Sequence, residues 1–84
     1  MVEVPLTDLR EGETGIITSI KAGFGHGKRW GLLKRLVDMG LTPGTKVTMV
    51  KSAPLNGPVE IYVRGYRLAL GRGMAKRITV EVQR

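Results

Sequence analysis

The sequence has no cysteine and only one histidine, His26, among its 84 residues. The lack of cysteine excludes disulfides, thiolate-ligated zinc and Cys/His catalysis. A lone histidine in a glycine-rich loop is poorly placed to act as the base of a Ser/His/Asp triad. Transition-metal sites use three or four ligands, so His26 is a metal-ligand candidate that cannot form a site alone. We therefore expect no enzyme, no catalytic residue and no cofactor that the fold requires.

The sequence also lacks a long uncharged apolar run, and we expect no secretory leader. No stretch approaches the length that a membrane-spanning helix needs. The first residues, MVEVPLTDLREGE, contain neither a basic start nor the apolar region of a signal peptide. A chain of 84 residues has room for one core, so we predict a single domain over residues 1–84. We expect this domain to be cytoplasmic.

Acidic residues and aromatic residues are both scarce. The chain has fourteen Lys and Arg but only seven Asp and Glu, which gives a net charge of +7 and favours anionic partners. Proteins that bind single-stranded nucleic acid combine a basic groove with several exposed aromatic side chains. Here aromatic residues are 5% of the chain and the basic residues are scattered from Arg10 to Arg84. Weak, non-specific nucleic-acid binding by a small β-barrel therefore stands as the alternative function.

Alternating apolar residues predict five short strands, at 14–21, 45–50, 59–63, 66–70 and 77–82. Arg64-Gly65, between the third and the fourth, is typical of a tight hairpin turn. Five alternating strands in so short a chain predict a mostly β protein that closes into a small barrel. The apolar positions expected to face the core of this barrel are Val59, Ile61, Val63, Tyr66, Leu68, Leu70, Ile78, Val80 and Val82.

One helix is predicted over about residues 28–39, KRWGLLKRLVDM. Gly40 follows where a helix end favours a left-handed residue, and Leu41 is placed for the apolar contact that accompanies such an end. Pro43 prevents the helix from resuming, and Pro43-Gly44 predicts a turn into the next strand. The spacing places Trp30, Leu33, Leu36 and Val37 on one face of the helix and Lys34, Arg35 and Asp38 on the other.

The apolar side of this helix is wider than one core contact needs. Leu32 and Met39 extend it to about 180°, against a stripe of roughly 100° for a helix with one buried face. Apolar residues left exposed beside Lys34 and Arg35 would form a partner-binding surface. Alternatively, the core absorbs Leu32 and Met39, and the sequence leaves both possibilities open. We refer to Leu32, Lys34, Arg35 and Met39 as the helix-edge surface.

The loop before the helix, AGFGHG, resembles a phosphate-binding loop only superficially. Gly23 and Gly27-Lys28 are one residue too close for that motif, and Arg29 stands where it requires Ser or Thr. We therefore expect no nucleotide site and no cofactor-binding residue in this loop.

Taken in order, the motifs of the chain resemble the ferrous iron transport protein A (FeoA) family. The stretches that carry the resemblance are PLTDLREGETGIITSI at 5–20, RLVDMGLTPGTKVTMV at 35–50, APLNGP at 53–58, IYVRGYRLAL at 61–70 and AKRITV at 75–80. Their key positions are Gly40, Leu41, Pro43, Gly44, Ala53, Pro54, Gly57, Pro58 and Gly65. The loop at 22–31, which contains His26, departs from the family pattern.

This resemblance implies an SH3-like five-stranded barrel with one inserted helix. It implies a small cytosolic accessory that binds or regulates the membrane ferrous-iron transporter FeoB, which carries a cytosolic G domain. Similar domains form the C-terminal module of iron-dependent repressors, but this chain has no DNA-reading helix-turn-helix. The family is also described as binding transition metal ions, although the ligands are not evident in this sequence.

Overall fold

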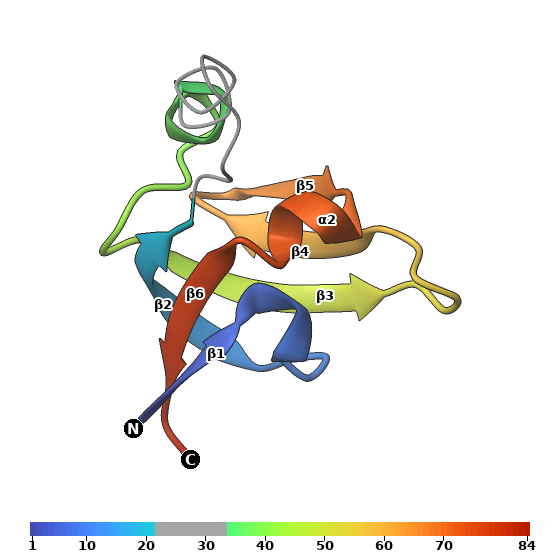
Figure 1. Cartoon of the computed structure of the whole chain (residues 1–84), viewed down its shortest axis with the longest axis horizontal. Coiled ribbons are helices and arrows are strands. Elements are labelled where there is room, and N and C mark those ends of the chain that lie inside the picture. Colours follow the sequence, from blue (N-terminus) through green and yellow to red (C-terminus); the bar gives the residue numbers. More distant parts are fainter. Residues whose placement is uncertain (22–33) are drawn as a thin grey trace.

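The computed structural model describes residues 1–21 and 34–84 (Figure 1). The alternating stretches form antiparallel strands because each buries one row of side chains and leaves the other in water. The elements are β1 (Val2–Pro5), η1 (Leu6–Asp8), β2 (Thr14–Ile20), β3 (Lys46–Ser52), β4 (Val59–Val63), β5 (Tyr66–Leu70), α2 (Arg72–Ala75) and β6 (Ile78–Val82).

The six strands form one sheet in the order β1-β6-β2-β3-β4-β5, with every neighbouring pair antiparallel. The five predicted strands are confirmed as β2 to β6, but the predicted number was wrong because β1 was missed. This strand is only four residues long and ends at Pro5, whose ring cannot donate to a ladder. It pairs with β6 alone, and edge strands tolerate such a proline.

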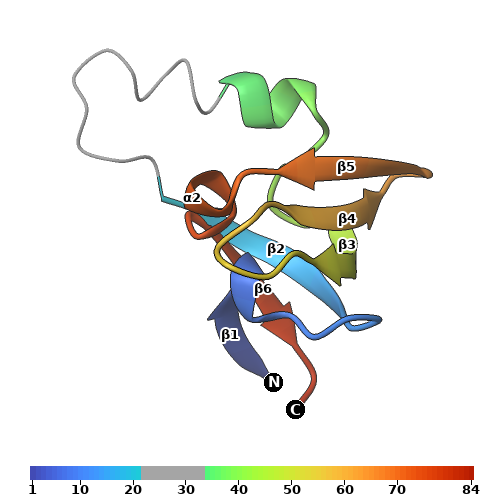
Figure 2. The ribbon, with the colours of Figure 1, turned by 90° about the vertical axis from the view of Figure 1, so that its right-hand side faces the viewer.

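The sheet curves strongly, so that β6 runs steeply across the direction of β3 (Figures 1 and 2). Two shifts of register help to bend it, one in β2 between Ile17 and Ser19 and one in β3 between Met49 and Lys51. The predicted mostly β class is confirmed. The linear strand order leaves β1 and β5 as the two edges of the described sheet.

The core lies inside this curve and contains the inward rows of the strands. The predicted core positions on β4 and β6 are confirmed, since all six are at most 1% exposed. The prediction for β5 was wrong at Tyr66, which is 42% exposed, whereas Leu70 is buried and Leu68 is half-buried. Other large side chains of the core are Leu6, Ile17, Leu36, Leu41, Val47 and Met49.

The predicted helix is confirmed over its described end, where residues 34–38 are helical. Its earlier part, with Trp30, Leu32 and Leu33, lies outside the described residues, as does the loop with His26. Leu36 is fully buried, as predicted, but Val37 is 53% exposed and the prediction that it faces the core was wrong. The helix therefore buries a narrower stripe at this end than its sequence indicates.

Candidate functional site

The helix ends in a tightly bonded cap. The Gly40 N–H donates to the Val37 carbonyl at 2.9 Å, and the Leu41 N–H donates to the Leu36 carbonyl at 2.8 Å. These two bonds, with Gly40 at φ +82°, define a Schellman motif, in which the residues at both ends of the longer bond pack together. Leu36 and Leu41 are both fully buried. The predicted left-handed Gly40 and apolar Leu41 are therefore confirmed.

The β4–β5 hairpin holds this helix end from the side. The Arg64 Nε donates to the Gly40 carbonyl at 3.1 Å, and the Tyr66 hydroxyl donates to the Met39 carbonyl. These carbonyls belong to the helix terminus, where backbone acceptors lack partners within the helix. The second arm of Arg64 donates to the Thr45 hydroxyl at 3.1 Å, at the entry of β3. The hairpin thus fixes the helix relative to the sheet.

The hairpin turn has the predicted form. Val63 pairs with Tyr66, which leaves Arg64 and Gly65 as the two loop residues. Their φ angles are +49° and +90°, as a two-residue turn between antiparallel strands requires. From this turn the Arg64 side chain reaches the helix end and the entry of β3. Nothing in the sequence pattern indicated that Arg64 would have this role.

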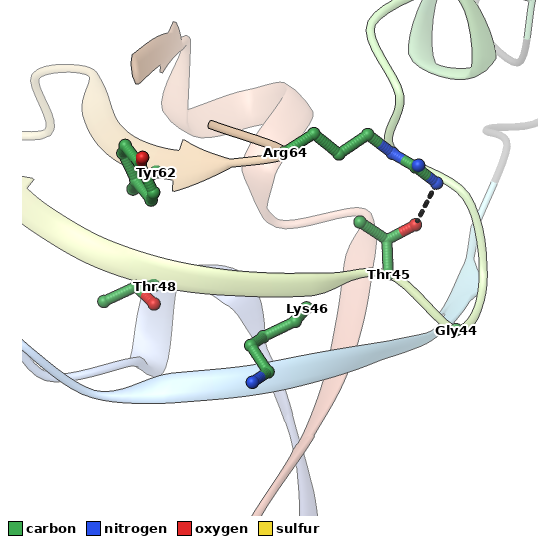
Figure 3. Close-up of a pocket in the computed structure, with 6 residues that line it drawn as sticks. All are labelled: Gly44, Thr45, Lys46, Thr48, Tyr62 and Arg64. Atoms are coloured by element: carbon green, nitrogen blue, oxygen red, sulfur yellow. Dashed lines mark hydrogen bonds between the residues drawn. The ribbon is translucent and has the colours of Figure 1, made fainter. Parts of the chain in front are cut away.

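A shallow hollow of about 340 Å³ opens beside this clamp (Figure 3). Lys46 and Thr48 line it from β3, Tyr62 lines it from β4, and Arg64 closes one end. Thr48 shares a 2.8 Å hydrogen bond with Thr14 of β2. The lining has two cations, hydroxyls and one half-exposed aromatic ring, and none of its residues is acidic. Such a hollow suits a polar or anionic group of a partner.

Two members of the predicted helix-edge surface lie in solvent. Lys34 and Arg35 are exposed, and the exposed Val37 adds an apolar side chain to the same helical segment. Met39 is partly buried and packs against the core. Leu32 lies outside the described residues. The helix-edge surface remains a prediction, and the exposed apolar residue that the structure describes there is Val37.

The APLNGP stretch forms the β3–β4 turn, and Arg72 of α2 holds this turn by hydrogen bonds. The Arg72 Nε donates to the Gly57 carbonyl at 3.1 Å. Its Nη2 donates to the Ala53 carbonyl at 3.0 Å and to the Ser52 hydroxyl at 2.9 Å. Sequence reasoning missed this arginine, because the bonded residues lie 15 to 20 positions away along the chain. Pro54 and Pro58 are exposed at the two sides of the turn.

A bidentate ion pair ties the end of the chain to the β1–β2 connection. Arg84 donates to both carboxylate oxygens of Glu13, at 2.7 and 3.0 Å, and to the Asp8 carbonyl at 3.1 Å. The hydrogen bond from Arg84 and then that from the Arg10 N–H lower the pKa of Glu13 from 4.5 to about 2. Since Glu60–Arg67 is the one other ion pair in the described part, most of the basic excess there is not neutralised by a nearby carboxylate.

The described residues show no arrangement suited to a metal centre. Over residues 1–21 and 34–84, no three Asp, Glu, His or Cys side chains gather where they could hold an ion. The candidate ligand His26 lies outside this part, so its role is untested. No helix in the same part is both long and apolar enough to cross a bilayer.

Fold and site together define a class of protein. It is a small antiparallel β domain in which arginine side chains hold a helix end and a turn in place. Comparison with known proteins identifies the family within this class. The FeoA domain model matches residues 4–82, so the chain belongs to the FeoA family. The resemblance inferred from the motifs is thereby confirmed.

Two relatives place the chain beside ferrous iron transport proteins. The chain is 40% identical over 77 residues to a candidate Fe(2+) transport protein A of Methanocaldococcus jannaschii, covering 92% of this chain and 84% of that protein. It is 31% identical over 77 residues to an Fe(2+) transport protein A/Fe(2+) transporter FeoB fusion protein of Porphyromonas gingivalis. That match covers 92% of this chain but only 8% of the fusion protein.

Solved structures confirm the fold. A crystal structure of the iron uptake regulatory protein FeoA has a TM-score of 0.80 at 35% identity, with 99% of this chain and all of that chain covered. Stenotrophomonas maltophilia FeoA, complexed with zinc and described as a procaryotic SH3 domain protein, has a TM-score of 0.74 at 27% identity, with 90% and 87% covered. A manganese-dependent transcriptional repressor matches over 42% of its length with a TM-score of 0.80. Its 17% identity supports a shared fold alone, as expected for the repressor module.

Proposed function

We propose that this chain is a small cytosolic accessory of the ferrous iron uptake system that binds or regulates the membrane transporter FeoB. The observation that carries this proposal is the Porphyromonas gingivalis fusion, in which a region 31% identical to this chain is part of one polypeptide named for FeoA and FeoB. Fusion supplies a high effective concentration of one module near the other. A separate chain has to obtain the same proximity through a binding surface.

The described structure supports binding as its role. Arg64 and Tyr66 hold the helix end in place, and Arg72 holds the β3–β4 turn. Among the described residues, no group of side chains is arranged to bind a metal ion. Rigid placement lowers the entropic cost of binding, since loops need not be ordered by the partner. The unneutralised basic side chains would steer the chain toward an acidic protein face. We propose the helix-edge surface, together with Val37, as one contact.

This proposal can be tested with full-length FeoB from the same organism, reconstituted in nanodiscs. The variant Arg35→Glu reverses one exposed charge of the helix-edge surface, and Lys76→Glu reverses an exposed charge at the end of α2 as a matched control. We expect Arg35→Glu to weaken binding several-fold without a change in melting temperature, because rim charges affect association more than stability. Lys76→Glu should bind like the unaltered chain. If the unaltered chain does not bind FeoB at all, the proposed function is wrong.

We further propose that the fold requires no metal ion, and that a transition metal bound by His26 would take its other ligands from carboxylates or from a second chain, because residues 22–33 contain no other Asp, Glu, His or Cys. The described core is apolar and its polar side chains have partners, so hydrophobic burial suffices to hold it. Melting curves with and without a chelator should coincide. A fall of ten degrees or more in chelator would contradict metal independence.

Nucleic-acid binding remains the second candidate, favoured by Tyr62 beside Lys46 and Arg64 in the hollow. One half-exposed ring offers one stacking position, whereas strand-binding proteins use several. We expect a Kd of about 10⁻⁴–10⁻⁶ M that weakens steeply with salt. Tight, sequence-dependent binding at physiological salt would make this the leading function.

A further inference from the structure

The β3–β4 turn carries the most exposed large apolar side chain of the described structure. Leu55 is 97% exposed, compared with 77% for Met1 at the chain end and 53% for Val37. A single exposed leucine on a surface is ordinary and needs no explanation by itself. The backbone beneath Leu55 makes this one unusual.

Leu55 has a backbone conformation that leucine disfavours. Its φ is +58° and that of Asn56 is +61°, and the Gly57 N–H donates to the Pro54 carbonyl at 3.1 Å. A turn with two left-handed central residues strongly favours glycine, asparagine and aspartate. A leucine there crowds its own backbone and, in this case, gains no burial in return. Neither local structure nor packing within the chain therefore accounts for a leucine at this position.

The turn is nevertheless held rigidly. Arg72 bonds its two sides through the Ala53 and Gly57 carbonyls. Gly57 also approaches Ala53 so closely that a Cβ on Gly57 would lie 2.8 Å from the Ala53 Cβ. A strained residue that persists in a well-supported frame is a recurrent feature of ligand-contacting sites. Here the frame holds the β3–β4 turn, which lies on a side of the molecule away from the helical segment (Figure 1).

The chemistry around Leu55 favours a protein pocket as its receptor. Residues 53–59 contain no charged side chain, although the chain as a whole carries +7, and the Arg72 guanidinium at this turn is engaged by the Ala53 and Gly57 carbonyls and the Ser52 hydroxyl. Contacts with anionic lipid or with nucleic acid phosphate would place Lys or Arg beside the tip. A second copy of this chain offers the hollow beside Tyr62, but its lysine, arginine and threonine lining is a poor receptor for leucine. A concave apolar site on a protein partner satisfies both the lack of charge and the rigid, convex shape.

From the exposure of Leu55, its disfavoured backbone and the frame that fixes it, we infer that Leu55 is an anchor residue that inserts into an apolar pocket on the cytosolic side of FeoB. This inference rests on the proposed function, because it takes the transporter as the partner. It is independent of the helix-edge surface, which lies elsewhere on the chain.

The test compares three chains against full-length FeoB of the same organism in nanodiscs: the unaltered chain, Leu55→Asn and Leu55→Met. Asparagine suits the left-handed position better than leucine, so Leu55→Asn should unfold at the same or a higher urea concentration. It removes the apolar anchor, so we expect binding to weaken at least tenfold. Methionine retains the apolar volume, so Leu55→Met should bind within about threefold of the unaltered chain.

The outcomes separate the inference from the function on which it rests. Equal binding by all three chains would overturn the anchor and leave the proposed function intact. Absence of binding by the unaltered chain would overturn both. Should Leu55→Asn unfold more easily than the unaltered chain, the argument from a disfavoured backbone would be wrong. In that case Leu55→Gly, which also suits a left-handed backbone, would decide whether the anchor itself exists.

Two further measurements test whether Leu55 binds a membrane or a second copy of this chain instead. The unaltered chain and Leu55→Asn are compared for binding to vesicles of neutral and of anionic phospholipid, and for self-association by sedimentation equilibrium. We expect no dependence on Leu55 in either measurement. Leucine-dependent vesicle binding or self-association would replace the protein pocket with a membrane or with a second copy, and would overturn the inference.

Discussion

Two regions of this molecule are held by arginine side chains that donate to backbone carbonyls, yet leucine is buried in one region and exposed in the other. Arg64 holds the helix end, where Leu36 and Leu41 are fully buried. Arg72 holds the β3–β4 turn, where Leu55 is almost fully exposed. Similar bonds therefore serve packing at one site and presentation at the other. At the turn, unlike at the helix end, the leucine itself adds no buried surface to the core.

The largest expected contrast comes from the same substitution at the two leucines. Leu41→Ala removes a fully buried side chain and should lower the free energy of unfolding by about 2–5 kcal/mol. Leu55→Ala removes an exposed side chain and should change it by less than about 0.5 kcal/mol. Urea titrations of both variants measure the two values. A large loss in Leu55→Ala would mean that the turn contributes to the core after all.

The two arginines offer the next comparison. Arg72→Met keeps much of the apolar stem but removes three partly buried hydrogen bonds, two of them to backbone carbonyls. We expect a loss of about 1–3 kcal/mol, because partly buried acceptors would be left unpaired. Arg64→Met removes two bonds, one of them at an exposed carbonyl that water can reach. Its loss should be smaller, at about 1 kcal/mol, and equal losses would remove the distinction between the two clamps.

Two glycines near the helix end, one beside Arg64 and one not, allow the contribution of Arg64 to be tested. Gly40 and Gly44 both have left-handed φ angles, of +82° and +91°. A Cβ on Gly44 would meet nothing within 4 Å, whereas one on Gly40 would lie 2.9 Å from the Arg64 Cδ. Gly44→Ala should therefore cost about 1 kcal/mol from backbone strain alone, and Gly40→Ala should cost somewhat more.

A double-variant cycle isolates the contact between Gly40 and Arg64. In the Arg64→Ala background, which has no side-chain atom beyond Cβ, the difference between Gly40→Ala and Gly44→Ala should shrink if it arises from the displaced arginine. A difference that persists in that background would assign it to the helix cap instead.

Local patterns predicted the parts of this fold that depend on neighbouring residues. Alternation identified the strands β2 to β6, and Gly40, Leu41 and Gly65 identified the helix cap and the hairpin turn. The short strand β1 was missed because its four residues carry too little pattern, and its stability comes from pairing with β6. Val37 and Tyr66 were misassigned because their exposure depends on where the helix meets the hairpin.

The candidate site was less accessible to sequence reasoning than the fold. Arg64 and Arg72 reach residues 15 to 24 positions away, and no local spacing encodes such contacts. Leu55 occurs within a recognised motif, APLNGP, but its importance depends on its φ angle and its exposure. The sequence Leu-Asn-Gly does indicate a turn, and a leucine among turn residues is the signal that could have singled it out.

The smallest expected effect concerns the tie between Glu13 and Arg84, which lies apart from both clamps. Arg84 donates hydrogen bonds to both carboxylate oxygens of Glu13, and the Arg10 N–H donates a third. Together these bonds lower the pKa of Glu13 from its ordinary 4.5 to about 2 in the folded chain. A carboxylate whose pKa is lowered by folding stabilises the fold above its ordinary pKa and loses that contribution as the pH falls toward the folded value. The stability of the unaltered chain should therefore decline between about pH 5 and pH 2. Glu13→Gln cannot ionise, so it should be less stable at neutral pH and should decline less over that range. Melting temperatures of both chains measured from pH 7 to pH 2 test this, and parallel curves would show that the tie contributes nothing to stability.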